Sequence, residues 1–126
     1  MKNNIDSLPT LEECKEFQET KRNIRVILKE LKDVIAEKYG DKIIPRFYEH
    51  VLSEDVHYSL DITFPEINYD LILISIKKNL CNEFPVGVYG INREKYYSAS
   101  SYDEIENFIQ EVLQSEELKT IILTHI

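Results

Sequence analysis

Residues 43–64 read IIPRFYEHVLSEDVHYSLDITF, and this stretch decides the fold because it predicts a β-hairpin. Two runs rich in β-branched and aromatic residues, 43–52 and 56–64, flank the polar turn 53–55. Side chains alternate between the two faces of a strand, so most apolar residues of both runs fall on one face. The centre of the chain is therefore predicted to be antiparallel sheet.

The side chains also select the register of this hairpin. With Val51 opposite Val56, Phe47 falls opposite Leu60, and the apolar side chains gather on one face. A shift by one residue would place Phe47 opposite Asp61 instead. We therefore expect the first register.

The run 69–78 predicts a further strand with a different pattern. Leu71 and Leu73 point one way while Ile72, Ile74 and Ile76 point the other, so apolar side chains are expected on both faces. A helix, the tail of the chain or a second copy of the chain would then have to cover the second face.

The N-terminal part of the chain predicts a long helix, 11–39. It starts at a capping box formed by Thr10 and Glu13. Such a helix would be about 43 Å long at 1.5 Å per residue. Because that is long for a domain of this size, a break near Thr20 stays open as an alternative.

Shorter segments complete the pattern. Runs 84–91 and 94–99 predict a last hairpin, and Ser101 and Ser115 are predicted caps of two C-terminal helices. The fold class is α+β, with a long N-terminal helix, an antiparallel sheet of about five strands and a C-terminal helix pair packed on it. We expect one domain over 1–126, in which residues 1–9 are a flexible tail.

Composition places the chain among globular proteins. No apolar run is long enough to span a bilayer, so no membrane association is expected. The start of the chain lacks the apolar segment of a signal peptide, which favours a cytoplasmic location. Cys14 and Cys81 are expected to be reduced, buried thiols.

Charge is distributed unevenly along the chain. Residues 1–46 hold ten Lys and Arg against nine Asp and Glu, whereas residues 47–126 hold five against fourteen. The net charge of −8 therefore comes from the second part of the chain. Such a balance favours a basic protein partner and disfavours nucleic acid.

A set of tyrosines and acids near the last predicted hairpin and helix is the leading candidate for that interaction. Aromatic anchors carry much of the energy of protein interfaces, and acids would attract a basic partner. The function expected from this pattern is a non-enzymatic acidic binding protein, for example an inhibitor or immunity-type protein. The predicted partner-binding residues are Tyr89, Tyr96, Tyr97, Tyr102, Asp103, Glu106 and Glu111.

An alternative site lies on the polar face of the first hairpin. In the expected register Arg46 is opposite Asp61, and His50 is opposite His57. These four residues could serve a small-ligand or metal-dependent enzyme. However, His57 and Asp61 would lie about 13 Å apart along one strand, too far to bind the same metal ion.

No catalytic motif, cofactor signature or metal-ligand spacing is recognisable in the sequence, so no catalytic residue, cofactor or metal is predicted. The third alternative is a structural homodimer that buries the second face of strand 69–78 against another copy of the chain.

Overall fold

The computed structural model describes residues 7–20 and 23–126, and these form an α+β fold. Helices precede and follow a five-stranded antiparallel sheet in which neighbours in sequence are neighbours in space. The elements are α1 Leu11–Thr20, α2 Ile24–Tyr39, η2 Gly40–Lys42, β1 Ile44–Leu52, β2 Asp55–Phe64, β3 Tyr69–Asn79, β4 Val86–Tyr89, η3 Ile91–Arg93, β5 Tyr96–Ala99, α3 Tyr102–Leu113 and α4 Glu116–His125.

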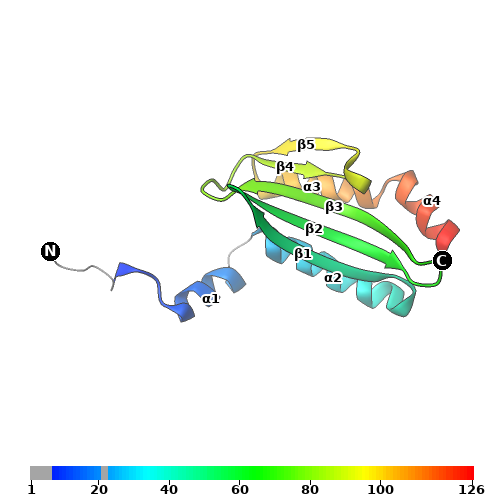
Figure 1. Cartoon of the computed structure of the whole chain (residues 1–126), viewed down its shortest axis with the longest axis horizontal. Helices are drawn as coiled ribbons and strands as arrows, with labels where there is room; N and C mark the ends of the chain where they lie inside the picture. The colour runs from blue at the N-terminus through cyan, green and yellow to red at the C-terminus, as the bar shows by residue number, and fades with distance from the viewer. Residues whose placement is uncertain (1–6, 21–22) are drawn as a thin grey trace.

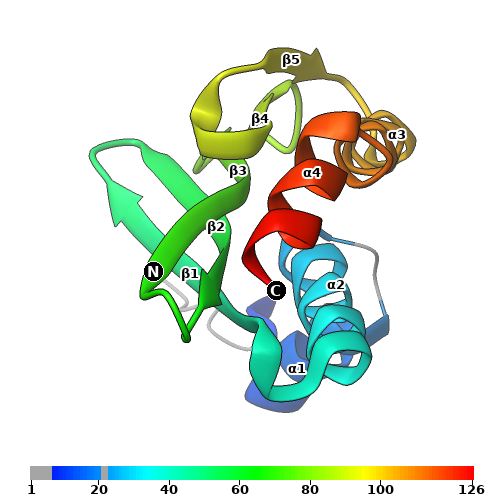
Figure 2. The same ribbon diagram turned by 90° about the vertical axis from the view of Figure 1, so that its right-hand side faces the viewer.

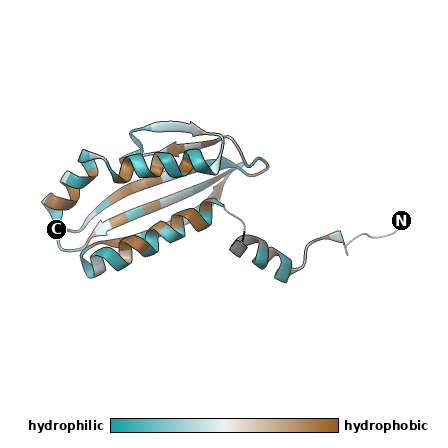
Figure 3. Cartoon of the chain, turned by 180° about the vertical axis from the view of Figure 1, so that it is seen from behind, coloured by the Kyte–Doolittle hydropathy of each residue, from teal (hydrophilic) through white to brown (hydrophobic). Residues whose placement is uncertain are grey.

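One face of the sheet is covered and the other is open. Helices α2, α3 and α4 lie together on the same side, as Figures 2 and 3 show from two directions. Figure 1 shows the molecule from the opposite side, with the strands in front of the helices. The core therefore lies between the sheet and this layer of helices, and it contains the largest buried side chains of both.

The predicted register of the first hairpin is confirmed. Val51 pairs with Val56, and Phe47 pairs with Leu60. Leu60 is fully buried, whereas Val51 remains 58% exposed because it lies at the far end of the hairpin. The apolar side chains of the hairpin thus face the helices, as the alternating pattern indicates.

The expectation that the next strand has two apolar faces is wrong. Strand β3 contains a β-bulge: Leu60 pairs with Ile74, but the next residue, Asp61, pairs with Ile72. One extra residue reverses the alternation of side chains. The bulge therefore lets nearly all apolar residues of β3 be buried in one core, namely Leu71, Leu73, Ile74 and Ile76.

The bulge also removes the sequence argument for a homodimer through the sheet face. Ile72, opposite Asp61, is partly exposed on the open face. In the part of the chain that the structure describes, the helices that pack on the sheet all cover the other face. The open face is otherwise lined mainly by polar and aromatic side chains.

The N-terminal helical segment is broken near Thr20, as the alternative left open for it stated. Helix α1 ends at Thr20, and α2 begins after Asn23, whose side chain accepts a hydrogen bond of 2.9 Å from the Val26 amide. Residues 21–22 between them, and residues 1–6 of the predicted tail, lie outside the described residues.

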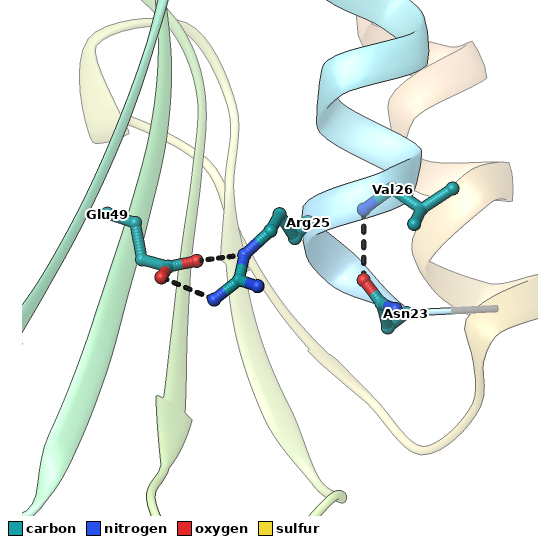
Figure 4. Close-up of polar contacts among 4 residues, drawn as sticks. All are labelled: Asn23, Arg25, Val26 and Glu49. Atoms are coloured by element: carbon teal, nitrogen blue, oxygen red, sulfur yellow. Dashed lines mark hydrogen bonds and ion pairs between the residues drawn. The ribbon is translucent and has the colours of Figure 1, made fainter. Parts of the chain in front are cut away.

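A bidentate ion pair connects α2 to the edge strand β1. Arg25 donates from Nε and Nη2 to the two carboxylate oxygens of Glu49, at 2.9 Å and 2.7 Å (Figure 4). The hydrogen bond to Glu49 raises the pKa of Arg25. Burial, followed by the charge of Glu49, raises the pKa of Tyr58. The ion pair between Arg25 and Glu49 holds the first turn of α2 over the sheet.

The last hairpin is shorter than predicted because η3 replaces part of it. Strand β4 pairs with only three residues of β3, 75–77. Beyond that point, Asn92 accepts a hydrogen bond of 3.2 Å from the Ile72 amide through its side chain. Helix η3 therefore covers an edge of β3 that would otherwise be unpaired.

The C-terminal helices begin at the predicted caps. Ser101 accepts a hydrogen bond from the Glu104 amide, and Ser115 accepts one from the Leu118 amide, both at 3.2 Å. At the far end of α4, the His125 ring lies 5.8 Å from the Phe64 ring, close to the β2–β3 turn. His125 thus packs the end of α4 against the sheet.

The two cysteines differ from the expectation. Both thiols are free, as predicted, but Cys14 and Cys81 are exposed rather than buried. Cys14 lies on α1, whose described side chains are all exposed, and Cys81 lies in the loop after β3. Neither position faces the core.

The packing of α2 leads to a stability prediction. Leu28 is fully buried against the sheet, whereas Val34 on the same helix is 58% exposed. We expect Leu28→Ala to lower the free energy of unfolding by about 2–5 kcal/mol, because it leaves a cavity. Val34→Ala should change it by less than about 0.5 kcal/mol. Urea unfolding followed by circular dichroism measures both, and equal effects would contradict this packing.

Candidate functional site

The open face of the sheet carries the polar pairs predicted from the sequence. Arg46 pairs with Asp61, and His50 pairs with His57. The two imidazole rings stack, with centroids 5.3 Å apart and planes inclined by 10°. The register therefore places these four residues on one face, as expected.

Only two of these four residues line the depression beside them. A depression of about 250 Å³ on the open face is lined by His50 and His57 but not by Arg46 or Asp61. Asp61 instead accepts a hydrogen bond from the hydroxyl of Ser59. Two residues of the predicted set thus border the depression, and two lie outside it.

The depression has further basic side chains that the sequence analysis did not select. The depression, which we call the cationic depression, is lined by His50, His57, Tyr58, Ser59, Ser75, Ile76, Lys77, Tyr89 and Arg93. Lys77 is directly opposite His57 in the β2–β3 pairing, and its Nζ lies 3.5 Å from Asp55 Oδ2. Continuing the hairpin register into β3 could have found Lys77.

Arg93 reaches the depression from η3. Asn92 and Arg93 have φ angles of 51° and 63°, in the left-handed region that non-glycine residues seldom adopt. The turn places Arg93 Nε 3.3 Å from the hydroxyl of Ser75, to which it donates. No pattern in the sequence indicates this contact, since it depends on the conformation of two turn residues.

The environment of His57 reflects this concentration of positive charge. Burial lowers the pKa of His57, and the charges of His50, Lys77 and Arg93 lower it further. Asp55 acts in the opposite direction but does not compensate for them. At His57, the basic neighbours therefore outweigh Asp55.

The predicted tyrosine and acid surface is divided between two sides of the molecule. Tyr89 pairs with Tyr96 on the open face, where their rings lie 5.1 Å apart. Tyr97 points to the other side and stacks on Phe108 of α3, with centroids 5.8 Å apart. Adjacent residues of β5 face opposite ways, so Tyr96 and Tyr97 cannot share one face.

Tyr97 is held in place by an acid of the α3 cap. Its hydroxyl donates to Glu104 at 2.9 Å, and this bond raises the pKa of Tyr97. Glu104 also accepts from the Ser100 amide at 2.7 Å, which is the main reason that its pKa is lowered. Glu104 thus has a structural role in capping α3 and in positioning Tyr97.

Tyr102 makes a separate set of contacts at the start of α3. Its hydroxyl donates to Glu83 at 2.6 Å, and its ring meets Phe84 edge-on at 4.9 Å. Asp103 follows it in the first turn of α3 and is exposed. This tyrosine connects the β3–β4 loop to α3.

Glu106 and Glu111 lie on different sides of α3. Glu106 borders a groove between α2 and α3, together with Glu30. Glu111 instead lines a hollow between α3 and the η3 turn, with Glu94, Lys95 and Glu117, which we call the acidic hollow. The charge of Glu111 reaches Tyr97 and contributes to raising its pKa.

Comparison of the chain with protein-family models, curated proteins and solved structures finds no match. Within residues 7–20 and 23–126, no group of three His, Cys, Asp or Glu side chains is placed to hold a metal ion. Over the same residues, no helix combines the length and the apolar character needed to cross a membrane.

The electrostatics of His57 can be measured directly. We expect its pKa to lie below 6.5 and to rise in Lys77→Met, because a positive charge is lost and Asp55 is released. With the folded pKa lowered, the unfolded chain binds this proton more readily. The contribution of His57 should therefore reduce stability as the pH falls through about 6.5.

NMR titration of the imidazole resonances gives the pKa of His57 in each protein. Lys78→Met is the matched control, since Lys78 does not line the depression and its Nζ donates to the Asn79 carbonyl at 3.2 Å. An equal shift in both variants would contradict the placement of Lys77.

Proposed function

We propose that this chain is a non-enzymatic binding protein that docks on a basic partner protein through the acidic hollow and Tyr97. The observation that supports this proposal is the meeting of Glu94, Glu111 and Glu117 at one hollow. Between Lys95 and Lys119 the sequence contains no basic residue.

Charge of this kind acts mainly on the encounter with a partner. An acidic surface attracts a basic protein over a distance and rejects acidic competitors. The whole chain has a net charge of −8, so the long-range field has the same sign as the hollow. Lys95 also lines the hollow and places one positive group among these acids.

Tyr97 supplies the aromatic anchor for this interaction. It is 39% exposed, while its ring rests on Phe108 and its hydroxyl is bonded to Glu104. A side chain already held in one conformation loses little entropy on binding. An ordered tyrosine beside several acids is suited to contact with an Arg- or Lys-rich surface.

The proposed surface is smaller than the one predicted from the sequence. Glu106 borders the groove between α2 and α3 instead, and Asp103 is exposed in the first turn of α3 without lining the hollow. Tyr89 and Tyr96 belong to the open sheet face, and Tyr102 packs at the β3–β4 loop. Glu94 and Glu117 join it from segments that the sequence analysis did not select.

The two alternative functions have less support. The enzyme alternative needs four side chains around one pocket, and the depression is bordered by His50 and His57 without Arg46 and Asp61. The homodimer alternative was based on a second apolar face of β3, and the bulge in β3 removes that face.

The proposal is tested by affinity capture from the source cell with the full chain as bait. We expect a basic protein to be retained at about 50 mM salt and released at about 500 mM, because exposed charges are screened. Glu94→Gln, Glu111→Gln and Glu117→Gln together should reduce its retention by about tenfold or more.

The matched control replaces three exposed acids away from the hollow, in Glu37→Gln, Asp41→Asn and Glu54→Gln. This protein has the same net charge as the triple variant of the hollow. It should retain the partner almost as well as the natural chain. If both triple variants lose the partner equally, net charge alone explains the capture and the proposed surface is wrong.

A further inference from the structure

The open face of the sheet has a second feature that is independent of the acidic hollow. The cationic depression brings together four basic side chains from four different elements: His50 of β1, His57 of β2, Lys77 of β3 and Arg93 of η3. Lys77 and Arg93 carry like charges at one depression, so they repel each other; Asp55 offsets part of this cost at Lys77, and a bound anion would offset more.

Strand register builds this cluster as two neighbouring rows across the sheet. In one row His50 pairs with His57, His57 with Lys77, and Lys77 with Gly87. This row provides the Lys77 ammonium and two imidazoles. Because the pairing is continuous, these side chains emerge on the same face at neighbouring positions.

The second row provides hydroxyl groups. Ser59 pairs with Ser75, and Ser75 pairs with Tyr89, whose own partner in β5 is Tyr96. Ser59 and Ser75 have short side chains, so they leave space above the sheet between the longer side chains around them. At Gly87, at the end of the first row, an added Cβ would lie 3.0 Å from the Tyr96 ring, so glycine allows this ring to approach closely.

Several hydrogen-bond donors can meet in this space. Arg93 uses Nε for its bond of 3.3 Å to the Ser75 oxygen, which leaves the Ser75 hydroxyl proton for another acceptor. The guanidinium of Arg93, the ammonium of Lys77 and the two imidazoles supply further N–H groups. The nearby acid Asp55 lies 3.5 Å from Lys77, and Asp61 is occupied by Ser59.

We propose that the cationic depression binds a phosphate group carried by a small molecule. A tetrahedral dianion has enough oxygens to accept from Arg93, Lys77, Ser75 and the imidazoles at the same time. The depression, about 250 Å³, lies below the roughly 300–1,000 Å³ of pockets for drug-sized ligands, so the organic part must be small.

A nucleic acid is a less suitable ligand for the same site. A polyanion would extend beyond the depression over a surface that includes Asp55, Asp61 and Asp70. The overall charge of −8 would also repel it. A single phosphate meets the positive groups and avoids most of the acids around them.

The test follows the backbone and imidazole NMR signals of the full chain as phosphate is added at constant ionic strength. We expect saturable shifts at His50, His57, Ser75 and Arg93. Lys77→Met and Arg93→Gln should each weaken binding by about tenfold, because each removes a charged hydrogen-bond donor. Lys78→Met and Lys95→Met are controls that remove one positive charge outside the depression.

Sulfate serves as a second probe because its charge, unlike that of phosphate, does not change near neutral pH. Lys77→Met and Arg93→Gln should each weaken the binding of sulfate by about tenfold, as they do for phosphate, because each removes a charged hydrogen-bond donor.

Other outcomes would overturn the proposal. Shifts that stay linear with phosphate concentration, or that are equal in the depression and control variants, indicate nonspecific attraction of an anion. A short single-stranded oligonucleotide that binds more tightly than phosphate would instead identify a nucleic-acid surface. Because the acidic hollow is not involved, failure of this proposal leaves the proposed docking function unchanged.

Discussion

The side chains that this protein buries depend on one extra residue, at the β-bulge of the central strand β3. Without the bulge, the pairing of Leu60 with Ile74 would continue unchanged, and Leu71 would point away from the helices. With it, the apolar residues on both sides of the bulge enter the same core, while Ser75 and Lys77 remain on the open face. Burial of apolar surface favours this solution strongly, because each exposed Leu or Ile would forgo about 1.5–3 kcal/mol. The bulge therefore determines both the core and the surface opposite it.

The same division separates two charged clusters of the molecule, the acidic hollow and the cationic depression. The helical side holds the acids of α3 and α4, several of which stabilise helix starts, as Glu104 does by accepting from the Ser100 amide. The open side holds a row of basic groups that contains His57 and Lys77. A sheet covered on one face makes this separation simple, because alternate residues of each strand belong to different environments. The two clusters therefore lie on separate parts of the molecule.

Much of the fold could be predicted from local patterns. The register of the first hairpin follows from placing Val51 opposite Val56, and the helix starts follow from Ser101 and Ser115, because these signals act between residues close in sequence. The candidate sites were harder to predict. Arg93 enters the cationic depression through a left-handed turn, and Tyr96 and Tyr97 are separated by the alternation of β5. Proximity in sequence was a poor guide to proximity on the surface.

The sequence by itself determined the α+β class, the antiparallel order of the strands and which residues begin the helices. These properties depend on side-chain periodicity and on hydrogen bonds within a few residues. Only the tertiary structure decided where β3 is bulged, which tyrosines meet acids, and that Lys77 and Arg93 join the two histidines. Those outcomes depend on burying a shared core between the sheet and three helices. The packing of that core is determined by the whole chain rather than by any single segment.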